Sequence, residues 1–131
     1  MNPEEWWKNF ALGIELDAAG AFIYNGIRSF HELPTLDHPA DSFEVLYNLS
    51  VGIERLLKVA IILVEHTDEI DINVFVEGLR SHNTIQLADR LSSQIELNLT
   101  DIHREFLSIL SKFYNTHRYG RYSMDSIPNI N

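Results

Sequence analysis

The stretch VLYNLSVGIERLLKVAIILV, residues 45–64, decides the fold class of this chain. Apolar side chains recur along it every three or four positions, the period of an α-helix that buries one side. In its second half, apolar residues fall on nearly every side of such a helix. A helix that is apolar all round is normally buried, so we expect this segment to be the central helix of a helical bundle.

The segments on either side of it also have helical patterns, and none reads convincingly as a strand. Residues 2–28 begin with a helix-start signal, Asn-Pro-Glu-Glu, and continue with apolar residues at helical spacing: Trp6, Phe10, Ile14, Ala18, Ala21 and Phe22. The four residues Asp41-Ser-Phe-Glu44 have the spacing of a capping box for the second helix. Short helices are expected near residues 73–79, capped by Asp71, and near residues 84–91.

A last long helix is expected to begin near Thr100 and to end at Gly120. These elements predict an all-α protein, an up-and-down bundle of four to five helices in which short helices lie between two or three long ones. The length of 131 residues fits one domain, which we place at residues 1–122, followed by a loose tail at residues 123–131.

Composition limits where the protein acts and what it uses. The chain has no cysteines, which excludes disulfides, a thiolate nucleophile and cysteine-based zinc sites. Its most apolar run, residues 56–64, is far shorter than the ~20 residues that cross a bilayer. The N-terminus lacks the basic and apolar regions of a signal peptide. We therefore expect a cytoplasmic protein with no membrane partner.

Charge is distributed unevenly along the chain. The formal net charge is −9, which argues against general binding of nucleic acid, because such binding depends on many Lys and Arg side chains. From residue 106 onward, however, Lys112, Arg118 and Arg121 face only Asp125. Residues 106–122, FLSILSKFYNTHRYGRY, are thus the best candidate for a local anion site.

On the predicted last helix, two neighbouring stripes carry these residues: Phe113, His117 and Arg121 on one, Tyr114, Arg118 and Tyr122 on the other. A histidine that moves protons and arginines that hold a phosphodiester are the groups needed for ribonuclease-like transfer. A purely structural interpretation is equally open, because cations near a helix C-terminus are favoured by the helix dipole. In that case His117 lies at the edge of the core.

Other familiar sites are missing from the sequence. No histidine pair has metal-ligand spacing, and no glycine-rich loop could hold a nucleotide phosphate, so we expect neither a metal nor another cofactor. Glu54, Arg55 and Lys58 are expected to form a solvated helix face with Glu54 paired to Lys58, although a functional role for the trio is the alternative.

Three stretches of the sequence resemble HEPN domains, the helical modules of prokaryotic defence, toxin–antitoxin and nucleotide-handling proteins. Residues 52–63, GIERLLKVAIIL, resemble the second helix of that family, with Glu and Lys four positions apart before an apolar run. Residues 82–87, HNTIQL, resemble its short segment in which a histidine introduces a helix. Residues 110–119, LSKFYNTHRY, fall where the family has its signature, and the resemblance covers about residues 45–122.

The resemblance implies two alternative functions. Active family members are metal-independent RNases with an Arg-x4–6-His motif that meets its copy across a homodimer. Here the nearest match is Lys112 followed by His117 and Tyr119, and lysine lacks the planar fork that grips phosphate at two points. The first implied function is therefore a non-catalytic dimerising domain that binds nucleotide, RNA or a protein such as an antitoxin. The second is an RNase with His117 as general acid/base and Lys112, Arg118 and Arg121 as phosphate ligands.

The candidate binding residues come from all three stretches, with Tyr122 just beyond the last. They are Glu54, Lys58, His82, Tyr114, Asn115, Tyr119 and Tyr122. The resemblance also implies a homodimer, which we expect to form through the long helices.

Overall fold

The structure is a computed structural model that describes residues 3–35, 37–67 and 69–119, with the backbone alone for residues 4 and 117–119. The described residues form five helices and no strands: α1 (Pro3–Glu32), α2 (Pro39–Glu65), α3 (Ile72–Glu77), α4 (Thr84–Ser92) and α5 (Asp101–Tyr119). The predicted all-α bundle, with short helices between the long ones, is confirmed. The predicted end at Gly120 and the predicted tail lie outside the described residues.

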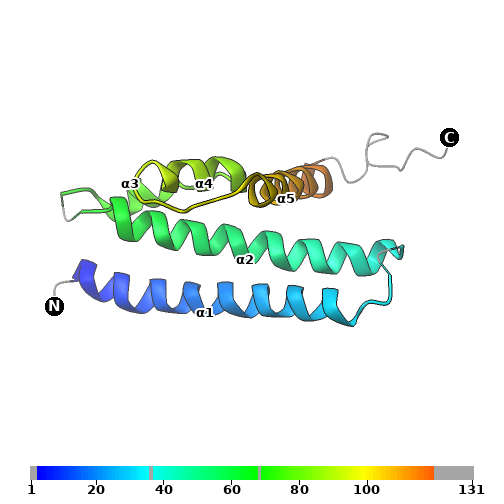
Figure 1. Cartoon of the computed structure of the whole chain (residues 1–131). Coiled ribbons are helices and arrows are strands. Elements are labelled where there is room, and N and C mark those ends of the chain that lie inside the picture. Colours follow the sequence, from blue (N-terminus) through cyan, green and yellow to red (C-terminus); the bar gives the residue numbers. More distant parts are fainter. Residues whose placement is uncertain (1–2, 36, 68, 120–131) are drawn as a thin grey trace.

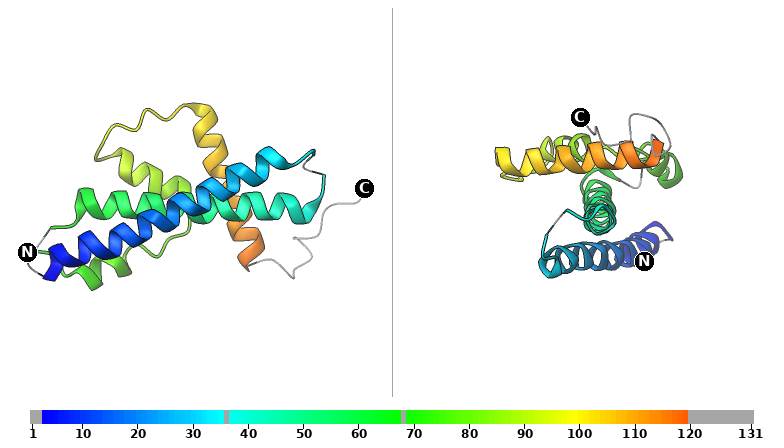
Figure 2. Two further views of the ribbon diagram at one scale, coloured as in Figure 1. Left: turned by 90° about the horizontal axis from the view of Figure 1, so that it is seen from below. Right: turned by 90° about the vertical axis from the view of Figure 1, so that its right-hand side faces the viewer.

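The helices lie in three layers with α2 in the middle (Figure 1). α1 runs antiparallel to α2 on one side, while α3, α4 and α5 cover the other side, where α5 crosses α2 (Figure 2). The predicted central position of α2 is therefore confirmed. The largest buried cluster joins α1, α2, α4 and Leu79, two residues after α3: Leu12, Val59, Ile61, Ile62, Leu79, Leu87 and Leu91.

The α1–α2 hairpin is close because small residues lie at its contact. A Cβ atom added to Gly52 would be 2.9 Å from the backbone nitrogen of Ile23 and 3.1 Å from the carbonyl oxygen of Ala19. One added to Gly26 would be 2.8 Å from two side-chain carbons of Leu49. Glycine at these two positions therefore lets the helix backbones approach.

The apolar series predicted for the first helix is partly on the wrong side. Trp6, Phe10 and Ile14 are more than half exposed, whereas Leu12 and Ala19 are buried against α2. α1 carries apolar residues on both of its sides, so spacing alone did not show which side packs. In the described part of the chain, no other helix covers the side of α1 that faces away from α2 (Figures 1 and 2).

The predicted capping box of the second helix is also wrong. α2 begins at Pro39, and its N-cap residue is His38, three residues before Asp41; His38 makes no side-chain capping hydrogen bond. Proline at the first helical position lacks the N–H that would otherwise need a partner, which favours a start there. Residues 41–44 therefore lie inside the helix.

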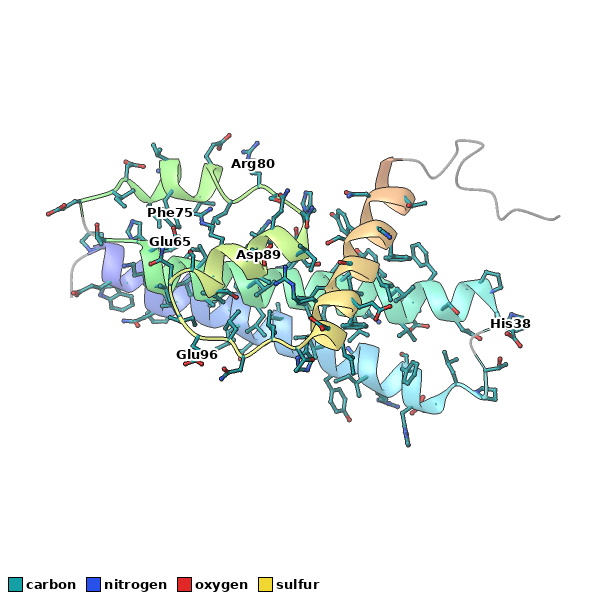
Figure 3. The ribbon with its side chains drawn as sticks, turned by 45° about the horizontal axis from the view of Figure 1, so that its top comes forward. His38, Glu65, Phe75, Arg80, Asp89 and Glu96 are labelled. Atoms are coloured by element: carbon teal, nitrogen blue, oxygen red, sulfur yellow. The ribbon has the colours of Figure 1, made fainter. Side chains whose placement is uncertain are left out.

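Short polar contacts fix the small helices. The predicted cap of α3 is confirmed, because the Asp71 carboxylate accepts hydrogen bonds from the backbone N–H groups of Asn73 and Val74. Glu65 of α2 forms two hydrogen bonds with Arg90 of α4, and the Arg90 guanidinium lies over the ring of Phe75. Figure 3 shows Glu65 and Phe75 close together on this side of the bundle. α3 and α4 are thus anchored to the C-terminal half of α2.

Candidate functional site

Three of the candidate binding residues meet at a buried carboxylate in α2. Glu54 is 8% exposed, and its Oε1 atom contacts both Nδ1 of His82 and, at 3.3 Å, the ammonium group of Lys58. The Glu54–Lys58 pair predicted from the sequence is confirmed. A buried carboxylate is stable only with such partners, so this cluster is a built feature of the fold.

A fourth candidate, Tyr114 of α5, joins the cluster through His82. The two rings are stacked, with centroids 4.8 Å apart and planes inclined by 28°. His82 lies just before α4, so a single imidazole links α2, α4 and α5. We call Glu54, Lys58, His82 and Tyr114 the Glu54 cluster.

A buried polar network next to His82 sets this geometry. Thr84, at the start of α4, donates a hydrogen bond to the carbonyl oxygen of Leu107 in α5. The hydroxyl of Ser111 lies 2.8 Å from that of Thr84 and 3.3 Å from the side-chain oxygen of Asn83, which also caps α4. These contacts lock the N-terminus of α4 against α5, and His82 immediately precedes them.

The Glu54 cluster, apart from Tyr114, lies at a cleft between α1, α2 and the segment from α3 to α4. The cleft has a volume of about 520 Å³, within the range of small-molecule sites. Glu54, Lys58 and His82 line it, together with apolar side chains such as Trp7, Leu12 and Ile62 and the exposed Arg80. Figure 3 shows Arg80 at the outer margin of the molecule.

The expectation of a solvated face is wrong for Glu54, which is buried, whereas Arg55 and Lys58 are partly exposed. All three residues line the cleft, and Arg55 bonds both carboxylate oxygens of Glu15 in α1 at 2.8 and 2.7 Å. The expectation failed because it treated α2 as a single helix, whereas α1 and residues 76–82 lie beside this part of it.

The remaining candidates of the last helix either lie away from the Glu54 cluster or lie outside the described residues. Lys112 and Asn115 are exposed. Lys112 is two positions from Tyr114, about 200° away around the helix, so it faces away from His82. The side chains of His117, Arg118 and Tyr119 lie outside the described residues, as do Arg121 and Tyr122 entirely.

Sequence reasoning missed Trp7, Glu15 and Arg80 in this region, and it did not find the partner of Arg55. The Glu15–Arg55 pair joins residues forty positions apart, so no local spacing could reveal it. Arg80 follows the end of a helix that was predicted too long. Trp7 is next to Trp6, and only the packing side of α1 distinguishes them.

The arrangement fits binding and proton transfer. When one imidazole nitrogen bonds a carboxylate, the ring is held in one orientation and one tautomer. Lys58 has three N–H donors, so it can bind a further acceptor beside Glu54. Among the described residues, no group of three His, Asp or Glu side chains is placed to hold a metal ion.

Comparisons with models of protein families, with curated proteins and with solved structures found no match to this chain. None of the helices in the described ranges is long and apolar enough to cross a membrane.

Proposed function

We propose that this chain is a HEPN-like helical domain that forms a homodimer and binds RNA or nucleotide phosphate without cleaving it. One observation supports the proposal above all. The three stretches that carry the resemblance are separate in sequence, yet Glu54 from the first, His82 from the second and Tyr114 from the third are in contact. A shared functional site gives a reason for three such motifs to meet.

Local charge makes phosphate a reasonable ligand despite the acidity of the chain. Arg55, Lys58 and Arg80 line the cleft beside the Glu54 cluster, against the carboxylates of Glu15 and Glu54. This is a local excess of cations in a chain with a formal net charge of −9. Lys58 is the least exposed of the three, and a cation partly shielded from water interacts with phosphate more strongly than an exposed one such as Arg80.

The second copy in the proposed homodimer covers the outer side of α1. Large apolar side chains lie exposed at both ends of that side, Trp6 and Phe10 near the N-terminus, Tyr24 and Ile27 near the C-terminus. With Gly13, Asp17 and Gly20 between them, they alternate at intervals of four and three residues, the a/d spacing of a coiled coil. A pattern of this kind is satisfied by another helix, and a second copy supplies an identical one.

Asp17 favours an antiparallel pairing. It lies in the middle of this stripe, so a parallel pair would place two Asp17 carboxylates opposite each other at an unfavourable distance. In an antiparallel pair, a and d positions face each other, and Asp17 faces Gly13 or Gly20 of the other copy. α1 has 30 residues and is about 45 Å long, enough for a substantial contact.

The binding proposal is tested with fluorescently labelled transfer RNA in EDTA, by anisotropy at about 50 and 200 mM salt. We expect binding that weakens with salt, and about tenfold weaker binding for Lys58→Met and for His82→Ala. Arg28→Met is the matched control, because Arg28 also pairs with a glutamate four residues away but is exposed and distant from the cluster. RNA binding that is unchanged in both cluster variants would exclude this site.

The dimer is tested by light scattering after size-exclusion chromatography. Phe10→Glu places a charge on the outer side of α1 and is expected to yield a monomer. Ile102→Glu is the control, because Ile102 is 78% exposed but belongs to α5. A native monomer at high concentration, or a dimer retained in Phe10→Glu, contradicts the proposal.

A metal-independent RNase is the second candidate. It is favoured by the contact between Tyr114 and His82, because the helix that carries residues 117 and 118 continues directly from that contact. The same RNA samples, resolved on a gel, distinguish the two functions. Cleavage in EDTA that is lost in both His117→Ala and Arg118→Ala would establish the RNase in place of the binding domain.

A further inference from the structure

The three walls of the cleft change from apolar to charged in the same direction. Along α1, the lining residues pass from Trp7 through Leu12 to Glu15. α2 runs antiparallel, and in reverse order its lining residues pass from Ile62 through Val59 to the charged Lys58, Arg55 and Glu54. The Glu15–Arg55 ion pair shows that the charged ends of these two walls adjoin.

The third wall follows the same order. It begins with Val76 in α3, continues through the buried Leu79, and ends at Arg80 and His82. The bond from His82 to Glu54 places this end beside the charged end of α2. The cleft is therefore apolar at one end and charged at the other, with the change made by all three walls together.

We propose that the cleft binds a small amphipathic acid, a molecule with an alkyl or aromatic body and a single carboxylate or phosphate head. The body lies along Trp7, Leu12, Val76 and Ile62, and the head lies near Lys58 and His82. The volume of about 520 Å³ suits one such molecule. This site goes beyond the proposed binding of RNA, because its apolar end, lined by side chains such as Trp7, Leu12 and Ile62, has no part in holding phosphate.

The negative charge proposed for the head group of the ligand follows from the side chains at the charged end of the cleft. Three cations, Arg55, Lys58 and Arg80, line the cleft against two carboxylates. Arg80 pairs with Glu77, but both side chains are largely exposed, and such a pair contributes little. The ammonium group of Lys58 contacts Glu54 at 3.3 Å and has three N–H donors, so it can bind an incoming anion as well.

The apolar end also restricts the body of the ligand. Its lining side chains are aliphatic apart from the indole of Trp7, and aliphatic groups cannot hydrogen-bond. Polar atoms of a nucleobase or sugar buried there would lose their bonds to water without replacement. A hydrocarbon body has no such cost, and its transfer from water into the cleft is favourable.

The experiment uses four probes with the same ten-carbon body, each below its micelle concentration: decanoate, decyl phosphate, decanol and decylamine. Trp6→Phe leaves Trp7 as the single tryptophan, because the chain has two, and its fluorescence reports occupation of the apolar end. From titrations of Trp7 emission, we expect decanoate or decyl phosphate to bind with a dissociation constant at least tenfold lower than that of decanol. Which of the two anions binds better identifies the head group.

Two variants complete the test, each in the Trp6→Phe background. Lys58→Met should weaken the binding of the anionic probes about tenfold and leave the binding of decanol unchanged. Arg28→Met should change the binding of neither kind of probe. Ala11→Phe places a ring in the cleft and should abolish binding of all probes while leaving RNA binding intact, which separates this site from the proposed function. Equal affinity for decanol and the anions, tighter binding of decylamine, or no response to any probe would overturn the proposal.

Discussion

Gly52 of α2 lies directly against the backbone of Ile23 in α1. A Cβ atom at Gly52 would be 2.7 Å from Cγ1 of Ile23 and 2.9 Å from its backbone nitrogen, and real Cβ contacts are essentially never that short. The backbone nitrogen cannot move aside without shifting the helix. The distance between α1 and α2 therefore depends on this glycine, and so does the cleft that the two helices line.

Gly52→Ala is expected to destabilise the protein by about 1–3 kcal/mol, because the added methyl group forces the helices apart. Gly20→Ala is the matched control, since a Cβ there meets nothing of its own chain within 4 Å, and both variants are compared in the Phe10→Glu background so that no second copy covers α1. In that exposed position, the better helix propensity of alanine should stabilise the protein by about 0.5–1 kcal/mol. Urea unfolding followed by circular dichroism measures both. Equal effects of the two substitutions on the free energy of unfolding would contradict the close contact of Gly52 with α1.

Thr84→Val is expected to destabilise the protein by about 1–3 kcal/mol. The substitution keeps the shape of a side chain that is 1% exposed but removes the hydroxyl that bonds Leu107 and contacts Ser111. The carbonyl oxygen of Leu107 and the Ser111 hydroxyl then lose a buried partner. Thr116→Val, at an exposed position on α5, should change the free energy of unfolding by less than about 0.5 kcal/mol. Similar changes in the free energy of unfolding for both variants would contradict the role of the Thr84 hydroxyl in holding α4 against α5.

The sequence predicted features that depend on neighbours in the chain. The cap at Asp71 and the pair of Glu54 with Lys58 are contacts within four residues, and helix geometry fixes them wherever the helix packs. The central position of α2 also followed, because a helix that is apolar all round must be covered. These predictions needed no knowledge of tertiary structure.

Features that depend on the approach of distant segments could not be predicted. The stacking of His82 on Tyr114 joins residues 32 positions apart and depends on the path of residues 93–100, which have no periodic pattern. The packing side of α1 was ambiguous because Trp6 and Trp7 are equally apolar and point to different sides. The burial of Glu54 depends on His82, which lies beside it only in the folded chain, so the sequence around Glu54 could not predict it.

Asp71→Ala is expected to loosen α3 without unfolding the bundle. The carboxylate satisfies two backbone N–H groups of a helix of six residues, and loss of an N-cap costs about 1 kcal/mol. None of the residues of α3 is buried, so the cost is local. Hydrogen exchange should become about fivefold faster for the amides of residues 74–78 and remain unchanged in α2. A matching acceleration in α2 would mean that α3 and the core unfold together.

Single-cysteine variants test the orientation of the proposed dimer, and the chain suits them because it has no native cysteine. In an antiparallel pair centred near Asp17, the two copies of residue 13 or of residue 20 lie close together. The two copies of residue 31 are then about 40 Å apart, since each residue adds 1.5 Å along a helix. A short bismaleimide should therefore cross-link Gly13→Cys or Gly20→Cys but not His31→Cys, as measured on a denaturing gel.

The same three variants distinguish the alternatives. A parallel pair brings each residue opposite its own copy, so all three variants would cross-link, and the argument from Asp17 would then fail. If none of them cross-links although light scattering shows a dimer, the second copy covers a different surface. Adding Phe10→Glu to the cross-linking variant is the internal control, because a specific product must disappear with the apolar contact, whereas random collisions between exposed thiols would persist.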